Sequence, residues 1–261
     1  MSIFLSQILE HKKDEVARAK GIRSLDSVIE SCHVMPSPRP FVEALRNHTG
    51  AIGLIAEVKK ASPSAGVIRT DFDYLQIAKE YEEAGADCIS VLTDERFFQG
   101  KLSYLSEIKQ AVSLPLLRKD FIVDEYQIYE ARAAGADAIL LIVAALEQEC
   151  LEKLYAVGRN LGLDILVETH TEAEMKIAAS LGFDLIGINS RDLKSFVTDL
   201  AIIDIVAKVA PPDAFLVAES GIKSSADVKR LHETGVSAIL VGETLMRAEN
   251  IRAAVANLLF K

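Results

Sequence analysis

The sequence lacks several features that would direct it to particular classes of protein. Its 261 residues hold only three cysteines, Cys32, Cys88 and Cys150, which lie far apart and form no metal-binding or redox motif. Free thiols of this kind are typical of a reducing compartment, so a cytoplasmic location is expected. The longest apolar run, 138–146, has nine residues, well short of the ~20 that a membrane helix needs. The N-terminal segment has no basic start, which argues against a secretory signal.

Basic clusters and metal-ligand patterns are also missing. The net charge is −9, and no basic stretch is longer than two residues. This balance argues against nucleic acid or a membrane as a partner, but it is compatible with an anionic small molecule bound by local cations. The five histidines are scattered, with no pair at metal-ligand spacing, so no metal site is predicted.

A helix-to-strand phrase recurs along the chain, and it predicts the fold. Each copy has a helix end, a capping glycine and an apolar strand; the copies are EEAGADCISVLT (82–93), ARAAGADAILLIV (131–143), ASLGFDLIGINS (179–190) and HETGVSAILVGE (232–243). Further buried runs complete a set of eight expected strands: 52–58, 87–92, 115–118, 137–143, 163–168, 184–189, 215–219 and 238–242. Eight strand–helix units, the last helix near 244–259, predict an α/β fold, a (β/α)8 TIM barrel. A doubly wound open sheet is the competing topology, but its Gly-x-Gly-x-x-Gly signal is absent.

The first 48 residues precede the expected barrel, which spans 49–261. Apolar residues at helical spacing predict an amphipathic helix in this segment: Ile3, Leu5, Ile8, Leu9 and Val16. The stretch MPSPRP (35–40) then interrupts the chain before a short helix near 41–47. These elements are too small for a separate domain, so we expect an N-terminal helical extension that packs on one end of the barrel.

Polar and charged residues stand where the expected strands end. The stretch IAEVKKASPSAG (55–66) places Glu57 and Lys59 on one face of the first strand, because strand side chains alternate. The carboxyl ends of barrel strands meet at one mouth, where catalysis occurs. The other strand-end residues are Lys119, Glu168, Asn189, Arg191, Glu219, Ser220, Gly221 and Gly242. Three carboxylates and three cations in one mouth favour acid–base chemistry on an anionic substrate.

Two glycines after the last strands point to phosphate. Gly221 and Gly242 follow strands seven and eight, where such barrels bind phosphate through backbone amides and helix N-termini. Glu243 adjoins Gly242, so its carboxylate has to turn away and leave only its amide for the ligand. His170 lies just past Glu168, and we interpret it as a loop residue.

These motifs resemble the indole-3-glycerol phosphate synthase family of the tryptophan pathway. The stretches that carry the likeness run in order from about Phe41 to the last helix: IAEVKKASPSAG, LRKDFIVDEYQI, LVETH, GINSRDL, VAESGI and VGETLM. The resemblance implies a (β/α)8 barrel with an N-terminal extension. It also implies ring closure, decarboxylation and dehydration of an anilino-deoxyribulose 5-phosphate, with no cofactor.

The resemblance implies a role for each matching residue. Lys119 matches the general acid of ring closure, and Lys59 the lysine that contacts the substrate carboxylate and phosphate region. Glu57 and Glu168 match carboxylates that assist proton transfer and dehydration. The remaining matches bind substrate, through Ser62, Phe98, Phe121, Asn189, Arg191, Glu219 and Ser220, or phosphate, through Gly221, Gly242, Glu243 and Lys59. Relatives often have Asn where this chain has Gln99.

The residue types suit this chemistry. Ring closure onto a carbonyl needs an acid, and a lysine with a lowered pKa can donate the proton. We expect Lys59 and Lys119 to lower each other's pKa, with Glu57 opposing. Dehydration needs one proton taken and one given, tasks that Glu57 and Glu168 can divide. Glu57 and Lys59 are therefore interpreted as catalytic and not as a salt bridge at a strand end.

Other functions remain open at this point. Another phosphate-binding barrel, such as a phosphoribosylanthranilate isomerase, needs an acid–base pair but gives no reason for paired lysines. A non-catalytic barrel acting as an interaction module, or a phosphate sensor, would bind without turnover. A monomer or weak homo-oligomer is expected.

Overall fold

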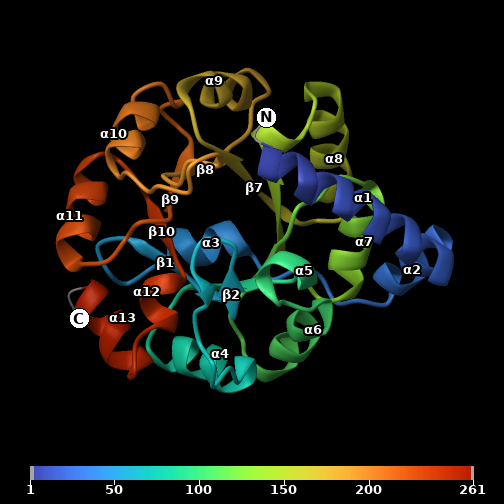
Figure 1. The fold of residues 1–261 in the computed structure, drawn as a ribbon, viewed down its shortest axis with the longest axis horizontal. Helices are drawn as coiled ribbons and strands as arrows, with labels where there is room; N and C mark the ends of the chain where they lie inside the picture. The colour runs from blue at the N-terminus through green and yellow to red at the C-terminus, as the bar shows by residue number, and fades with distance from the viewer. Residues whose placement is uncertain (1–2, 260–261) are drawn as a thin grey trace.

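The predicted barrel is confirmed. The computed structural model describes residues 3–259, and within them eight parallel strands close on themselves in the order β1-β10-β9-β8-β7-β6-β5-β4. Figure 1 shows these strands inside a ring of helices. Because β1 pairs with both β10 and β4, the sheet has no open edge, which excludes the doubly wound alternative.

The expected strands agree with the observed ones to within one residue at each end. The barrel strands are β1 (Gly53–Val58), β4 (Cys88–Leu92), β5 (Leu116–Lys119), β6 (Ala138–Ile142), β7 (Asp164–Thr169), β8 (Leu185–Asn189), β9 (Phe215–Glu219) and β10 (Ala238–Val241). The helices that alternate with these strands and surround the barrel are α4 (Tyr74–Glu83), α6 (Leu102–Ala111), α7 (Glu125–Ala133), α8 (Gln148–Asn160), α9 (Glu172–Ser180), α10 (Ala201–Ala207) and α11 (Ser225–Glu233).

The structure corrects the sequence prediction in the connecting segments. The helix expected near 244–259 is two helices, α12 (Glu243–Met246) and α13 (Ile251–Leu259). Loops near the barrel ends contain short elements that no periodicity predicted: the hairpin β2 (Ala61–Ser62) and β3 (Gly66–Val67), the helix α5 (Glu95–Phe98) and the 3-10 turn η1 (Val143–Ala145). Such elements are too short to show a period, so the sequence predicts only loop there.

Side-chain capping sets where several helices begin. Asp124 accepts a hydrogen bond from the Tyr126 amide before α7, and the Asp124 amide donates one to Gln127 Oε1. Ser224 and Asp227 form the equivalent capping box before α11. These side chains satisfy amides that have no partner inside their own helix. Capping therefore fixes the residue at which each of these two helices begins.

Strand alternation divides the core into two parts. One apolar cluster lies between the strands and the surrounding helices, and it includes Leu54, Ala56 and Val58 of β1. The other fills the barrel, with inward-facing Ile55, Leu117 and similar residues from the remaining strands. The period of two thus packs one face of each strand against helices and the other inside the barrel.

A short helix fills one end of the barrel. Helix α3 (Phe41–Arg46) contributes Phe41 and Leu45, which are fully buried in the same cluster as the barrel interior. The Phe41 backbone carbonyl accepts a long hydrogen bond from the Cys88 thiol at the start of β4, 3.5 Å away. The segment 41–47 is therefore helical as predicted, and it closes the end opposite the carboxyl ends of the strands.

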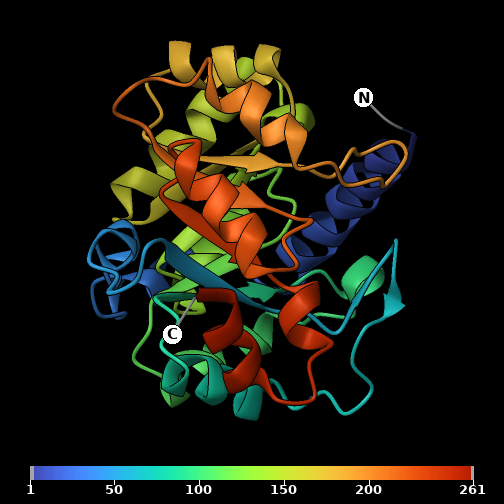
Figure 2. The same ribbon diagram turned by 90° about the vertical axis from the view of Figure 1, so that its left-hand side faces the viewer.

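The N-terminal segment packs on the barrel through α1 (Ile3–Ile22) and α2 (Leu25–His33). Of the apolar positions predicted for α1, Leu5, Ile8, Leu9 and Val16 are buried, whereas Ile3 is 83% exposed. Val16 and Val28 pack with Tyr126 of α7. Figure 2 shows α1, the hairpin after β1 and the loop after β8 extending from the same end of the barrel.

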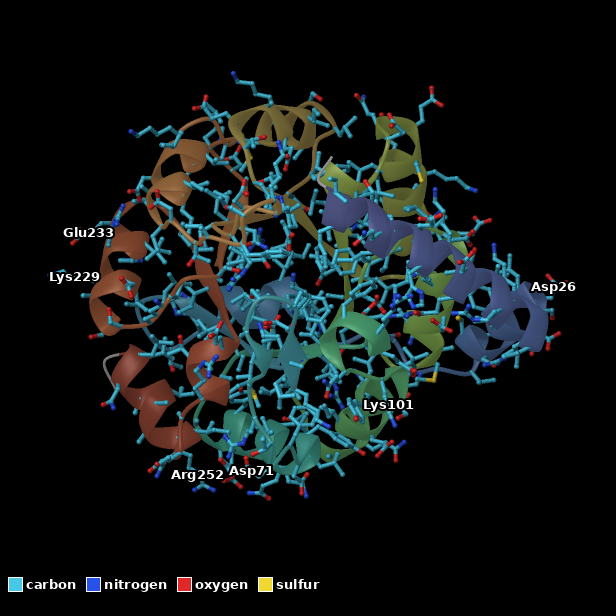
Figure 3. All side chains as sticks on the ribbon, viewed as in Figure 1. Asp26, Asp71, Lys101, Lys229, Glu233 and Arg252 are labelled. Carbon is cyan, nitrogen blue, oxygen red and sulfur yellow. The ribbon has the colours of Figure 1, made fainter. Side chains whose placement is uncertain are left out.

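Charged side chains also cover the outer surface of the helices. Figure 3 labels several of them, including Lys229 and Glu233 on α11, at the periphery of the molecule. None of the helices within residues 3–259 is long and apolar enough to cross a membrane. The same residues contain no group of three or more His, Cys, Asp or Glu placed to hold a metal ion.

Candidate active site

A cavity of about 1070 Å³ opens at the carboxyl ends of the strands. Its walls include every site residue predicted from the sequence: Glu57, Lys59, Ser62, Phe98, Lys119, Phe121, Glu168, Asn189, Arg191, Glu219, Ser220, Gly221, Gly242 and Glu243. The structure thus brings together residues that lie up to 186 positions apart in the chain, from Glu57 to Glu243. The roles assigned to them stay predictions.

The strand alternation explains why these side chains meet. Ile55 faces the barrel interior, and two residues later Glu57 occupies the next inward position on β1. Leu117 and Lys119 repeat this relation on β5, and the pairs Leu166–Glu168 and Val217–Glu219 repeat it on β7 and β9. An apolar layer therefore supports a charged layer directly above it. The barrel holds these charged groups while leaving them access to the cavity.

A glycine makes room for the charges on β1. A Cβ atom at Gly242 would stand 2.1 Å from Glu57 Oε2 and 2.9 Å from Lys59 Nζ. Real Cβ atoms do not approach so closely, so any side chain at this position would displace the pair. Gly242 is thus required by the neighbouring strand, in addition to any contact its amide makes with a ligand.

Glu57 and Lys59 form a salt bridge, which corrects the prediction that they would not. Lys59 Nζ donates a hydrogen bond to Glu57 Oε2. Both side chains are largely buried, with 15% and 5% of the Lys59 and Glu57 side chains exposed, and both line the cavity. Each charge compensates the other, so neither side chain is buried without an ionic partner. The salt bridge is therefore part of the site.

Lys119 bridges two carboxylates. Its Nζ donates to Glu168 Oε2 at 2.8 Å and lies 3.1 Å from Glu219 Oε2. Burial lowers the pKa of Lys119, but the charges of Glu168, Glu219 and Glu57 outweigh it and raise this pKa above its ordinary value. The expectation of a pKa lowered by Lys59 is therefore wrong, because three carboxylates surround Lys119.

The two carboxylates on Lys119 differ in their protonation. Burial alone raises the pKa of Glu168, but Lys119 and His170 reverse this and lower it to about 2. Burial also raises the pKa of Glu219, where the Lys119 charge opposes it and the Glu168 charge adds to it, so the pKa reaches about 8. The surroundings therefore favour the ionised form of Glu168 and the protonated form of Glu219. One base and one acid therefore face the same cavity.

His170 is the residue whose surroundings the sequence did not predict. It lies in the loop after β7, as expected, but only 8% of its side chain is exposed. Its Nε2 is 3.4 Å from Glu168 Oε1, and its Nδ1 is 3.3 Å from Glu174 Oε2. A spacing of two from Glu168 was the available signal, because alternation places both side chains on one face.

Backbone geometry shapes the cavity wall after β9. Ser220 and Gly221 are both left-handed, with φ of 66° and 73°. The Ser190 hydroxyl donates to the Ser220 carbonyl at 3.0 Å, which fixes this turn from the neighbouring strand. A non-glycine residue in this conformation costs energy, and such residues gather at functional sites.

The Glu243 carboxylate is turned toward arginines. Arg247 Nε donates to Glu243 Oε1 at 2.9 Å, and Arg191 Nη2 lies 3.8 Å from Glu243 Oε2. The repulsion that Glu243 would exert on a phosphate is thus offset by two cations. Arg247 also lines the cavity, and the sequence did not predict it because it lies four residues beyond Glu243, the last residue considered at a strand end.

Aromatic and aliphatic side chains form the other wall. The rings of Phe98 and Phe121 stand 6.2 Å apart at 39°. Leu92 and Leu140 add apolar surface from the strands, as does Leu5 from α1. Sequence periodicity marked Leu5 as a buried residue, but it gave no sign that the burying surface was the cavity.

Gln99 adopts a conformation that favours other residues. It ends α5 with φ of 53° and ψ of 32°, in the left-handed region. Asn and Gly tolerate this region better than Gln does. Asn or Gly at position 99 would thus suit the turn better, whatever contact the side chain makes with a ligand.

The closed barrel, with paired lysines and glutamates at the carboxyl ends of its strands, defines the class of protein: a (β/α)8 barrel enzyme. The family model described as "Indole-3-glycerol phosphate synthase" matches residues 5–258. The chain belongs to this family. The match begins within α1, so it includes the extension as well as the barrel.

Curated relatives agree along nearly their whole length. The chain is 49% identical to indole-3-glycerol phosphate synthase of Geobacillus thermodenitrificans, over 97% of this chain and 96% of the relative. It is 49% identical to the enzyme of the same name from a Polaromonas species, over 99% and 98%, and 46% identical to that of Neisseria meningitidis serogroup C, over 99% and 100%.

Solved structures at low identity share the fold. A 3-hexulose-6-phosphate synthase aligns with 80% of this chain and 99% of its own at a TM-score of 0.64 and 15% identity. The N-acetylmannosamine-6-phosphate 2-epimerase of Clostridium perfringens aligns with 82% and 93% at a TM-score of 0.62 and 14% identity. These likenesses show the barrel architecture alone.

Proposed function

We propose that the chain converts 1-(2-carboxyphenylamino)-1-deoxyribulose 5-phosphate to indole-3-glycerol phosphate, with carbon dioxide and water as the other products. Family membership over residues 5–258 carries this conclusion, and it assigns a carboxy-lyase activity in tryptophan biosynthesis, as in the named relatives. The charged layer supports it, because the reaction needs an acid and a base around an anionic substrate.

Lys119 is the general acid of ring closure in this proposal. Its raised pKa keeps it protonated at neutral pH, so the proton is present before the reaction starts. As the aromatic ring attacks the ketone, the oxygen becomes an alkoxide, a much stronger base than an amine, and Lys119 Nζ can transfer its proton there. A lowered pKa is then unnecessary for the step.

The remaining catalytic roles divide among three side chains. Lys59 contacts the substrate carboxylate and phosphate region, and binding there would separate it from Glu57. Carboxylate loss leaves electrons that restore the ring, and dehydration then removes one proton and protonates the departing hydroxyl. Glu168, the ionised carboxylate on Lys119, suits the base. Glu57 assists these proton transfers, since it faces the same cavity.

Substrate binding uses the other cavity residues. Phe98 and Phe121 are positioned to flank the anthranilate ring. The polar residues that orient the sugar chain and carboxylate are Ser62, Asn189, Arg191, Glu219 and Ser220. The phosphate is bound at the far end by the backbone of Gly221, Gly242 and Glu243, with Lys59 supplying charge.

Other aspects of the molecule belong to the same proposal. We propose that residues 1–48 are a helical extension of a single domain whose barrel spans 49–261, supported by the burial of Lys12 from α1 among barrel carboxylates. The partner is a small phosphorylated molecule, with no nucleic acid or membrane. The chain acts in the cytoplasm without a cofactor, as a monomer or weak homo-oligomer.

A product assay with one variant and one control tests the proposal. Indole fluorescence should appear when the wild type acts on the anilino-deoxyribulose phosphate. Lys119→Ala should lose about 10²–10⁴-fold in kcat with KM largely kept, whereas Lys229→Ala on the outer face of α11 should match the wild type. Full activity in Lys119→Ala would refute the acid assignment, and no turnover by the folded wild type would refute the proposed reaction.

A further inference from the structure

Lys119 carries one positive charge and contacts two buried glutamates. The distances are nearly equal, 2.8 Å to Glu168 and 3.1 Å to Glu219. Two carboxylates that share a site do not both ionise readily, so one holds a proton. Because Lys119 contacts both glutamates, its charge alone does not determine which of them holds the proton. Another group must favour one of the two.

His170 faces only one of the pair at contact distance. Its Nε2 lies 3.4 Å from Glu168 Oε1, the oxygen on the side away from the Lys119 hydrogen bond. Within residues 3–259 this buried nitrogen has no hydrogen-bond partner. The separation is suited to a charge interaction, and it can shorten to a hydrogen bond with a small rotation of either side chain.

Glu174 holds the imidazole in place. Its Oε2 accepts a 2.7 Å hydrogen bond from the His170 amide and lies 3.3 Å from His170 Nδ1. Glu174 is on the first turns of α9, so the helix after β7 supports a residue of the preceding loop. A carboxylate at Nδ1 favours the proton there and the charged imidazolium.

The surroundings of Glu219 differ on this point. Its Oε1 is buried and finds no hydrogen-bond partner among the described residues. An ionised oxygen without a partner is costly to bury, whereas a neutral carboxyl is much less so. Among the described residues, Glu168 thus has a second cation beside Lys119, whereas Glu219 has none at a comparable distance.

We propose that His170, held by Glu174, is a positioning residue that makes Glu168, and not Glu219, the ionised carboxylate beside Lys119. Glu168 then enters the reaction as the base, and Glu219 retains a proton. His170 does not line the cavity, so it acts through Glu168 and not on the substrate. This inference rests on the proposed function for its kinetic test, but its protonation claim does not depend on activity.

The charges around His170 come from several elements. Glu168 on β7 and Glu174 on α9 are the contacts, and Glu219 on β9 adds a longer-range attraction. Burial lowers the pKa of His170, but these carboxylates outweigh it and raise the pKa above the ordinary value. Lys119 on β5 opposes them from beyond Glu168. The three acids outnumber the one cation, which favours the charged form of His170.

The pH profile of kcat/KM gives the first test. In His170→Gln the cation is lost, so the acid limb, where the base becomes protonated, should move up by about one pH unit. Glu174→Gln should move it in the same direction by less. Glu172→Gln, which removes an exposed acid from the same helix, is the matched control and should leave the limb unchanged.

A direct titration gives the second test without using activity. The side-chain carboxyls are labelled with ¹³C, and their resonances are assigned with Glu168→Gln and Glu219→Gln. In the wild type the Glu168 resonance should titrate well below that of Glu219, and His170→Gln should narrow the gap between them by about one pH unit.

The outcomes separate this inference from the proposed function. An unmoved acid limb in folded His170→Gln, or Glu219 titrating below Glu168 in the wild type, would overturn the inference while leaving the reaction intact. If His170→Gln does not fold, Glu174→Gln and the wild-type titration still decide. A wild type that titrates as expected but forms no indole product would overturn the reaction alone.

Discussion

Gly187 lies against the carboxylate of Glu219, so closely that a Cβ at position 187 would stand 2.2 Å from Glu219 Oε1. Gly187 is the inward-facing residue of β8 between Leu185 and Asn189. The missing side chain is therefore the space in which Glu219 lies. Inward-facing side chains of adjacent strands pack against each other in one layer, so the small residue on β8 determines where the acid on β9 can lie.

Gly187→Ala should damage the site more than the fold. The added methyl group overpacks the barrel, which should cost about 1–3 kcal/mol of unfolding free energy, and it should displace Glu219 from Lys119. We expect at least about a tenfold loss of kcat/KM, because misplaced catalytic groups lose much of their effect. Steady-state kinetics and chemical denaturation measure the two effects.

The matched control is Gly21→Ala. In α1 a Cβ at Gly21 meets no atom of the described chain within 4 Å, so this variant should keep full activity. It should gain about 0.5–1 kcal/mol from helix propensity. Equal activity in the two variants would contradict the packing argument.

Glu219 should make the protein less stable as the pH rises toward the alkaline range. Its pKa is raised from 4.5 to about 8 in the native state, so the native protein holds a proton that the unfolded chain releases. The stabilisation is complete below the unfolded value and is lost as the pH rises through about 8. Glu219→Gln should remove this loss.

The measurement compares wild type and Glu219→Gln by denaturant unfolding at several pH values. From about pH 6 to pH 8 the variant should gain up to about 3 kcal/mol relative to the wild type, since each pH unit is worth about 1.36 kcal/mol for one proton. A difference that stays constant with pH would show that Glu219 is already ionised in the native state.

Lys12 should anchor the N-terminal extension. It comes from α1, has no exposed side-chain surface, and lies 3.0 Å from Asp94 and 2.9 Å from Asp120. Lys12→Met would leave buried Asp94 without its cation and Asp120 with Arg118 alone, which should cost about 3–5 kcal/mol of stability. Asp120 follows Lys119, so activity should also fall.

Thermal unfolding and kinetics of Lys12→Met test this anchor, with exposed Lys13→Met as the control. A single transition at lower temperature is expected if residues 1–48 and 49–261 fold as one domain. Two separate transitions, or a variant as stable as Lys13→Met, would contradict this interpretation.

Gln99→Gly should stabilise the protein. The left-handed backbone at residue 99 strains Gln but not Gly, so the variant should gain about 0.5–1 kcal/mol of unfolding free energy. The matched change Gln110→Gly, in the right-handed helix α6, should lower stability by a similar amount. Denaturant titrations of both should give opposite signs; a loss in Gln99→Gly would show that its side chain makes a contact worth more than the strain.

The sequence predicts the barrel well because the signals for it are local and repeated. Each buried strand carries its own apolar run, and each helix its own cap, so errors do not accumulate along the chain. The short hairpin β2–β3 and the break between α12 and α13 escaped because two to four residues show no period. Contacts with the rest of the molecule fix them instead.

The site divides in the same way. Alternation and strand-end position place Glu57, Lys119 and Glu168 at one mouth from sequence alone. Their protonation states could not be predicted, because these depend on distances between strands that are far apart in the chain. The sequence predicts that Lys59 lowers the pKa of Lys119, but the charges of three carboxylates raise it instead. The His170 contact with Glu168 and Glu174 is of the same kind.

Helix α3, which closes the end of the barrel opposite the cavity, has a consequence for turnover. Because Phe41 and Leu45 occupy that end, the substrate must arrive, and indole product, carbon dioxide and water must leave, through the mouth bordered by α1 and the loops after β1 and β8. Substrate entry and product release use the same opening, so a bound product excludes the next substrate. Product should therefore inhibit competitively, and changes that loosen the bordering loops should act first on the rate of product release.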